Sequence, residues 1–513
     1  MGPLLGVTLP RPRLTLTPFF LAALLGPGMA LAATYYPARR AGRRAPLEDL
    51  LQKGPARQER PRRWPSYAGL ALLSLVFVTV LGILEGWFPL AVVPSLLAPA
   101  VGCGLAGCVL ALPLIMRPLA RLAGWLVRPA LGMEGRLALR QLERHPTRTA
   151  LTAGVLFIGV AVSIAFGQSL LNSVRDIERW CDENLRLDFI VRGVMADTSL
   201  VVTPAPLPET LAEELARLDG VAFVGKVNFI PARVHGRQVI VLPVSVDSGR
   251  DMPFSLVAGH EAEVKRRFLQ GEVVVATALA HRVGLQVGDE ITVATRLGPR
   301  GLRIAALTSE YTVGGMVLYM NWDQGKELFV TRGVHALTVK ARPGTAPGLD
   351  GTLRRFCGDR GLFCQSFADF RGLLERMISG VVNLYWGLVG LVFVVASLGV
   401  VNTLTMNVLE QTRELGILRA IALKRRQVRK MILAQALALS VMSLLPGMLA
   451  GVLLAYLMNL GVHPVLGQWI AFHLDVPFLA GCFVTALAIA VLAAWFPARR
   501  AARLQVVQAL HYE

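Results

Sequence analysis

A short charged stretch between two apolar runs carries residue types suited to binding a partner protein. The segment 410–420 reads Glu-Gln-Thr-Arg-Glu-Leu-Gly-Ile-Leu-Arg-Ala. As a helix, it places Glu410 beside Glu414, four residues apart. Its apolar residues are Leu415, Ile417, Leu418 and the following Ile421. A short amphipathic helix of this kind suits docking in a groove of another protein. On these residues alone, an ordinary solvated loop is the open alternative.

The sequence contains none of the motifs that carry the commonest enzyme chemistries. It has no Gly-x-x-x-x-Gly-Lys-Ser/Thr phosphate loop, no His-Glu-x-x-His zinc motif and no Gly-x-Ser-x-Gly nucleophile elbow. There is no Cys-x-x-Cys pair, and the histidines are isolated. We therefore expect no catalytic residue, metal site or cofactor in this chain. Any ATP, with its Mg²⁺, must be bound and hydrolysed by another chain.

The charged stretch lies between two long apolar runs, which must hold it in position. Only 17% of the residues are charged, whereas soluble proteins have about 25%. A span needs roughly 20 apolar residues. Seven runs qualify, at about 14–34, 67–88, 92–116, 149–171, 380–405, 431–459 and 475–496. The first is followed by basic residues, whereas a signal peptide is preceded by them, so we interpret it as a span. A tight turn at Gly86–Pro89 predicts that the second and third form a hairpin.

The basic residues predict the orientation of these spans. The net charge is +19, and Lys and Arg gather beside the apolar runs, which argues for membrane orientation and against nucleic acid binding. The basic segments are 35–66, 117–148, 413–430 and the tail from Arg499. With seven spans they share one side, which the positive-inside rule makes cytoplasmic. The N-terminus is then expected outside and the C-terminus inside.

Residues 172–378 form one large segment that we expect outside the membrane, as a mixed α/β domain. We expect helices at Asn172–Arg186, Glu209–Leu218 and Phe367–Ser379. Strands are expected at Leu187–Arg192, Val221–Ile230, Val239–Val246, Glu272–Ala276, Glu290–Ala294 and Leu337–Lys340. Cys357 and Cys364 fall in this segment, and both a disulfide and two free thiols are open to them.

An internal repeat links the two ends of the chain. The segment 14–40 aligns without a gap on 474–500, and the match is sharpest where Tyr35-Tyr36-Pro37-Ala38-Arg39-Arg40 faces Trp495-Phe496-Pro497-Ala498-Arg499-Arg500. Such a repeat indicates duplicated membrane modules. Only the last span of the first copy is present, so we expect its earlier spans to be missing, left out by a misassigned start of the reading frame, or separately encoded.

The string from Arg413 to Leu433 resembles the signature loop of FtsX-like and MacB-like ABC transporter permeases. The matching positions are Arg413, Glu414, Gly416, Arg419 and Ala420, whereas Ala422 replaces the family's usual Gly. The segment 139–149 is similar to the family's helix before a span, and the chain's end to the family's C-terminus. The segments 271–276 and 284–291 resemble the MacB-type periplasmic core domain.

The resemblance implies a polytopic α-helical protein of about seven spans with one mixed α/β periplasmic domain. Its expected parts are a last span of a truncated first module (1–34), a cytoplasmic basic linker (35–66), a two-span hairpin (67–116), a cytoplasmic helix (117–148), a span (149–171), the periplasmic domain (172–378) and an FtsX-like domain with three spans, docking loop and tail (379–513).

The family also implies the partners and the mechanism. A cytoplasmic ABC ATPase dimer would dock on Glu410, Arg413, Glu414, Gly416, Arg419 and Ala420. The other partners would be a second permease module, membrane lipid and, as an open possibility, a periplasmic adaptor. The protein would lie in a bacterial inner membrane and export or extract a lipophilic or lipid-anchored substrate, as in lipoprotein export. The alternative is a relay that transports nothing and regulates a periplasmic enzyme or sensor.

Overall fold

The computed structural model describes residues 16–41, 64–89, 92–144, 146–184, 188–193, 206–246, 252–257, 260–410, 417, 424–462, 467 and 470–503. By internal packing the chain divides into two units. One unit comprises Met1–Pro61 with Ala196–Val202 and holds helix α1 (Leu16–Ala41). The other, Arg62–Met195 with Thr203–Glu513, holds all the elements discussed below.

Six described helices are long and apolar enough to cross a membrane. They are α3 (Trp64–Leu84), α4 (Val93–Arg144), α5 (Pro146–Asn184), α11 (Phe367–Glu410), α13 (Arg425–Leu460) and α15 (Val476–Ala502). They coincide with six of the seven predicted runs. The seventh falls in α1, whose apolar part, Phe19–Leu31, is shorter. The predicted turn at Gly86–Pro89 joins α3 to α4, and Gly86 has the positive φ of 73° that such a turn favours.

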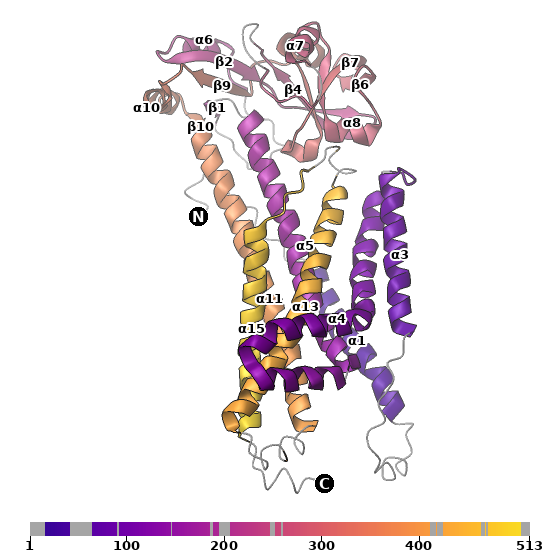
Figure 1. Ribbon diagram of the computed structural model, residues 1–513. Coiled ribbons are helices and arrows are strands. Elements are labelled where there is room, and N and C mark those ends of the chain that lie inside the picture. The colour runs from indigo at the N-terminus through magenta and orange to yellow at the C-terminus, as the bar shows by residue number, and fades with distance from the viewer. Residues whose placement is uncertain are drawn as a thin grey trace. The chain divides into compact units, whose positions relative to one another are not determined.

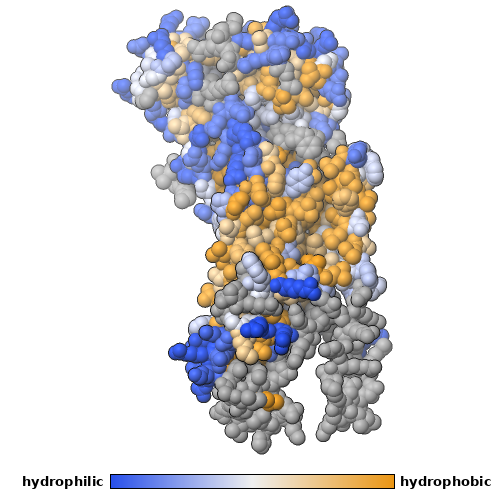
Figure 2. Space-filling view, viewed as in Figure 1, coloured by the Kyte–Doolittle hydropathy of each residue, from blue (hydrophilic) through white to orange (hydrophobic). Residues whose placement is uncertain are grey.

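The helices present apolar side chains outward. On α11, Leu384, Leu391 and Leu398 are 67%, 61% and 62% exposed and follow one another at seven-residue spacing, so they lie on one stripe. Figure 2 shows apolar residues covering the visible face of the helices, whereas polar residues cover much of the α/β domain. The stripe is therefore the lipid-facing surface expected of a spanning helix.

Helix α13 lies at the centre of the bundle, where it packs against α5, α4 and α15. Two glycines one turn apart allow the closest approach. A Cβ on Gly447 would lie 3.1 Å from the Phe157 carbonyl oxygen, and one on Gly451 would lie 2.8 Å from that of Ala161. This is the small-xxx-small arrangement that lets helix backbones meet in a membrane.

The α/β domain is built on ten described strands. These are β1 (Phe189–Gly193), β2 (Val221–Val227), β3 (Ile230–Val234), β4 (Arg237–Val244), β5 (Val273–Ala276), β6 (Glu290–Thr295), β7 (Gly298–Thr308), β8 (Val317–Asn321), β9 (Ala336–Ala341) and β10 (Leu362–Ser366). The helices around them are α6 (Thr210–Ala216), α7 (Glu261–Leu269), α8 (Thr277–Val283), α9 (Trp322–Phe329) and α10 (Ala346–Gly358).

The strand order is β10-β1-β9-β2-β4-β3-β6-β7-β5-β8, and β8 also pairs in parallel with β4. The six strands from β4 to β8 therefore close into a ring, which we call the closed half. All six contribute to one apolar core that includes Val234, Val241, Ile291 and Leu318. Strands β10, β1, β9 and β2 form the open half, whose core includes Leu215 of α6 and Leu353 of α10. Figure 1 shows both halves.

Every predicted strand corresponds to an observed one, but the prediction Val221–Ile230 was too long. That run ends at Val227, and a separate strand, β3, begins at Ile230. Strands β3, β7, β8 and β10 had no counterpart in the sequence analysis. Strand β7 begins Gly-Pro-Arg-Gly, which is typical of a turn, yet its backbone pairs with β6 from Gly298 to Arg303.

We expect Gly451→Leu to destabilise the bundle, because the new side chain would overlap the α5 backbone. Overpacking of this kind costs typically 1–3 kcal/mol. The thermal unfolding midpoint of the full chain in detergent should fall. Gly481→Leu in α15 is the matched control, since a Cβ there meets nothing within 4 Å. Equal midpoints for the two variants would contradict the packing of α13 on α5.

Candidate functional site

Two membrane helices enter the α/β domain through one pair of strands. Helix α5 ends four residues before β1, and α11 begins at the residue after β10. Strands β1 and β10 pair antiparallel, with Phe189 opposite Ser366. The Asp188 carbonyl accepts a hydrogen bond of 2.8 Å from the Phe367 amide, the first residue of α11. The first residue of α11 is thus joined by a backbone hydrogen bond to the residue before β1, the strand that follows α5 in the chain. We call this the helix–strand junction (Figure 1).

Asp188 also ties the junction to the middle of the open half. Its backbone N–H donates to the Val339 carbonyl at 3.1 Å. Its carboxylate accepts from the Ala341 amide at 2.8 Å and lies 3.4 Å from the Lys340 ammonium. Both partners belong to β9, which pairs with β1 and β2. The junction is therefore bonded directly to β9, which lies between β1 and β2 in the open half.

The last turns of α5 contact the closed half as well. The Trp180 indole N–H donates to the Ser309 carbonyl at 2.9 Å, and its ring meets that of Tyr311 edge-on, with centroids 5.7 Å apart. The Tyr311 hydroxyl donates to Asp176 on α5. Nearby, the Asn184 side-chain oxygen accepts from the Ser255 amide at 2.7 Å. Helix α5 is thus attached to both halves of the domain.

The Tyr319 phenol stabilises the segment Ser309–Tyr311, which contacts α5. The Tyr319 hydroxyl donates to Glu310, whose residue is 6% exposed. Burial, reinforced by the neighbouring carboxylate, raises the pKa of Tyr319 well above its usual value, so the phenol stays protonated as a donor. The chain from Ser309 to Tyr311 is thereby fixed beside α5.

Ion pairs on the surface connect α11 to its neighbours. The Arg371 guanidinium lies 2.8 Å from Asp182 of α5, and the Arg354 guanidinium of α10 lies 2.5 Å from Asp369. All four side chains are substantially exposed, so each pair contributes about 0–1 kcal/mol. They orient the helices at the junction more than they stabilise the fold.

Polar side chains in α5 hold the segment before α15. Gln168 and Asn172 are essentially unexposed. Gln168 donates to the His473 carbonyl and accepts from the Asp475 amide at 3.2 Å. Asp475 also lies 2.5 Å from Arg175 and caps α15 by accepting from the Phe478 amide at 3.0 Å. The half of α5 nearer the α/β domain is therefore fixed to the start of α15.

The residues predicted to dock a partner follow directly on α11. Glu410 is its last residue, whereas Arg413, Glu414, Gly416, Arg419 and Ala420 lie outside the described residues. Helix α11 has 44 residues, so the distance from the junction to Glu410 is roughly 65 Å along the helix. The predicted docking loop and the α/β domain thus lie at opposite ends of one continuous helix.

Several helix ends pack around the two ends of this loop. Ala138 and Leu142 of α4, Met431 of α13 and Ala498 of α15 belong to one buried cluster. Gln435 of α13 donates a hydrogen bond to Gln141 of α4. Of the segment predicted as one cytoplasmic helix at 117–148, residues 117–144 are the second part of α4, in which the chain turns at Gly132 with φ 53°. Residues 146–148 instead begin α5, which starts at Pro146. This packing gives α11 and α13 a fixed base beside the loop.

The structure describes all six cysteines as free thiols. Cys357 and Cys364, for which a disulfide was one alternative, are buried together in the core of the open half. The hydrogen bond between the two thiols lowers the pKa of Cys357 and raises that of Cys364. The pair joins α10 to β10, the strand that leads into α11.

Residues 386–506 match the FtsX-like permease C-terminal family. They include the predicted docking loop, α13 and α15. This part of the chain is an FtsX-like permease domain. The resemblance predicted from Arg413–Leu433 and from the end of the chain is therefore confirmed.

The whole chain is related to ABC transporter permeases. It is 25% identical over 508 residues to an uncharacterized ABC transporter permease protein of Mycobacterium tuberculosis, covering 96% of this chain and 57% of that protein. It is 25% identical over 272 residues to the lipoprotein-releasing system transmembrane protein LolC of Neisseria meningitidis, covering 47% of this chain and 65% of that one. The chain thus spans less than two thirds of the length of either relative.

The α/β domain is similar to a solved structure, the periplasmic region of MacB from Actinobacillus actinomycetemcomitans. The identity is 14% and the TM-score 0.27, and the match covers 38% of this chain and 94% of that one. The six apolar helices and the mixed α/β domain agree with the predicted fold, a polytopic α-helical membrane protein with one mixed α/β domain.

Sequence reasoning missed the contacts that make the junction. Trp180, Asp182 and Asn184 read only as residues of an emerging helix. One signal was available at Gln168 and Asn172, because polar residues at the end of an apolar span usually face a partner inside the protein.

We expect Trp180→Ala to loosen α5 from the closed half, because the indole supplies both a hydrogen bond and a ring contact to residues 309–311. Backbone amide exchange in that segment should become about tenfold faster, by local opening. Hydrogen-exchange mass spectrometry of the full chain measures this. Trp64→Ala, at a side chain 76% exposed, is the control and should leave the segment unchanged. Equal exchange rates in both variants would refute the attachment.

Proposed function

We propose that this chain is the permease subunit of an ABC transporter and works as a mechanical relay. A cytoplasmic ATPase dimer binds the loop that contains Glu410, Arg413, Glu414, Gly416, Arg419 and Ala420, and the chain itself hydrolyses nothing. The observation that carries the proposal is the continuity of α11, which runs from Glu410 to the strand pair of the α/β domain. The match of the loop to the FtsX-like family supports the same reading.

A mechanical relay needs parts that move rigidly and one contact whose affinity differs between the nucleotide states of the ATPase. Helices α5 and α11 are the rigid parts; Arg371 of α11 pairs with Asp182 of α5, and the strands beside them, β1 and β10, pair through their backbones. The docking loop supplies the differential contact: it must bind one nucleotide state of the ATPase better than the other, because equal affinity would shift nothing. Charge-assisted hydrogen bonds between the ATPase and the side chains of Arg413 and Glu414 fix the orientation of the docked loop.

The proposed orientation places the docking loop and C-terminus in the cytoplasm and the N-terminus and α/β domain outside. The basic segments support it, since 35–66, 117–148 and 413–430 would share the cytoplasmic side. A complete transporter would need a second permease module, from another copy or a separate chain. Repeated Pro-Ala-Arg-Arg ends at Pro37 and Pro497 support a duplicated ancestry for such modules.

The proposed substrate class is lipophilic or lipid-anchored, exported or extracted from the membrane. The relationship to LolC, a lipoprotein-releasing system protein, supports this class. A relay that moves no substrate and regulates a periplasmic enzyme is the second candidate, because the helix–strand junction would serve it equally well. ATP-dependent loss of a lipoprotein from reconstituted vesicles favours transport, whereas a periplasmic hydrolase bound to 172–378 favours regulation.

We expect Glu414→Arg to uncouple ATP hydrolysis from movement of the α/β domain while the chain still inserts. Reversing one charge removes a charged hydrogen bond and places like charges together, which should weaken docking by about tenfold or more. Nucleotide-dependent exchange of the α/β domain in the reconstituted complex is the readout. The matched charge reversal Glu178→Arg, at an exposed site on α5, should keep the coupling. Intact coupling in Glu414→Arg would count against the docking assignment.

The orientation has its own test, in a chain whose native cysteines are replaced. A membrane-impermeant maleimide applied to intact cells should label Arg237→Cys in the α/β domain and a cysteine placed within residues 1–13. It should not label Arg503→Cys at the end of α15, because the bilayer separates that end from the reagent. Labelling of Arg503→Cys alone would invert the topology.

A further inference from the structure

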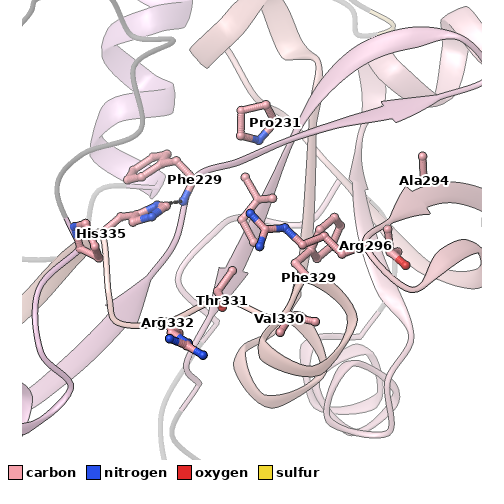
Figure 3. Close-up of a pocket in the computed structure, with 12 residues that line it drawn as sticks. Phe229, Pro231, Ala294, Arg296, Phe329, Val330, Thr331, Arg332 and His335 are labelled. Atoms are coloured by element: carbon pink, nitrogen blue, oxygen red, sulfur yellow. Dashed lines mark hydrogen bonds between the residues drawn. The ribbon is translucent and has the colours of Figure 1, made fainter.

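The sheet of the α/β domain opens between β3 and β6. These neighbours pair only at Val234 and Val293, and away from that point the strands diverge. A cavity of about 800 Å³ lies in the opening, between the start of β3, the end of β6 and the chain that follows α9. Figure 3 shows the side chains that line it. A volume of this size is typical of sites for small organic ligands.

Part of the wall is apolar. Phe229 and Pro231 line it from the β3 side, and Phe329 lines it from the end of α9. Phe329 is 3% exposed and therefore fixed by the core beneath it, whereas Phe229 is 38% exposed. A flat or branched apolar group could pack on these surfaces, and its burial would favour binding.

The charged part of the wall is positive. Arg296 reaches the cavity from the β6–β7 turn, and Arg332 from the segment after α9. Neither guanidinium forms a hydrogen bond or ion pair with any residue in the described ranges, and no acidic residue is among those that line the cavity. His335 is the third titratable group. Burial lowers its pKa, and its Nδ1 accepts a hydrogen bond of 3.0 Å from the Phe229 amide, so the ring is neutral near pH 7.

The segment that carries Arg332 is held in place before any ligand arrives. Asn228 is 1% exposed, accepts from the His335 amide at 2.7 Å and donates to the Gly333 carbonyl at 3.3 Å. Leu207 and Val334 exchange backbone hydrogen bonds of 2.7 and 2.9 Å. The cavity wall is therefore preformed, which reduces the entropy lost on binding.

The backbone conformation of Val330 is a second observation that points to a ligand-binding site. It lines the cavity with φ 50°, in the left-handed region that a β-branched residue rarely adopts. Strained backbone of this kind gathers at ligand-binding sites, where the surrounding structure enforces it.

We propose that this cavity binds a small organic anion. Arg296 and Arg332 hold its carboxylate or phosphate group, since a guanidinium fork matches the oxygens of either anion, and its apolar body packs on Phe229, Pro231 and Phe329. The site lies between the two halves of the domain: Arg296 belongs to the closed half, and the segment of Arg332 leads into β9 of the open half. A ligand that fits one relative position of the halves better than another would favour that position.

The test uses phenyl phosphate as the probe and the full chain in lipid nanodiscs, with empty nanodiscs subtracted. Saturation-transfer difference NMR should show saturable binding, at about millimolar concentration for a ligand of this size. Benzyl alcohol, which lacks the anion, should bind at least about tenfold more weakly.

Two variants and one control make the result decisive. Arg296→Gln with Arg332→Gln removes both charges, and Ala294→Trp adds bulk to the cavity wall at β6 while both charges remain. Both should reduce the phenyl phosphate signal at least about tenfold. Arg300→Gln, at an exposed arginine of β7 outside the cavity, should keep it. Absence of saturable binding to the unaltered chain, or an equal signal from the cavity-filled variant, would overturn the proposal.

Discussion

The structure depends on the antiparallel pairing of β1 with β10. This short backbone ladder leads directly from β10 into α11, and the Asp188–Phe367 hydrogen bond closes it at the end where α11 begins. Because a paired strand cannot slide by one residue without losing its register, the ladder fixes the start of α11 relative to β1. The proposed relay depends on that constraint.

The other contacts of α5 and of Asp188 determine which parts of the protein are attached to the paired strands β1 and β10. Trp180 and Asn184 attach α5 to the closed half, and Asp188 attaches the junction to β9 of the open half. Gln168 and Asn172 connect the same helix to the start of α15. Helix α5 is thus the element through which the FtsX-like domain, the membrane bundle and both halves of the α/β domain are coupled. Its partner α11 carries the loop at the other end.

The sequence predicted the features that are local or strongly periodic. Six spans, the helix leading out of the fourth span, and the family of residues 386–506 followed from apolar length, charge placement and a matching string around Arg413. It did not predict β7, whose Gly-Pro-Arg-Gly start is held in the ladder by tertiary pairing against local preference. Nor could it predict Asp182 beside Arg371 or Arg296 near Arg332, because such pairs arise only once distant strands have met.

The proposed relay requires α5 and α11 to move as one body at the junction when the ATPase changes state. Spin labels at the exposed positions Arg179 of α5, Arg376 of α11 and Glu85 after α3 report this by pulsed electron resonance in the complete complex. On adding nucleotide, the distance from Arg376 to Glu85 should change, while that from Arg179 to Arg376 stays fixed. A change between Arg179 and Arg376, or no change in either distance, would contradict the account.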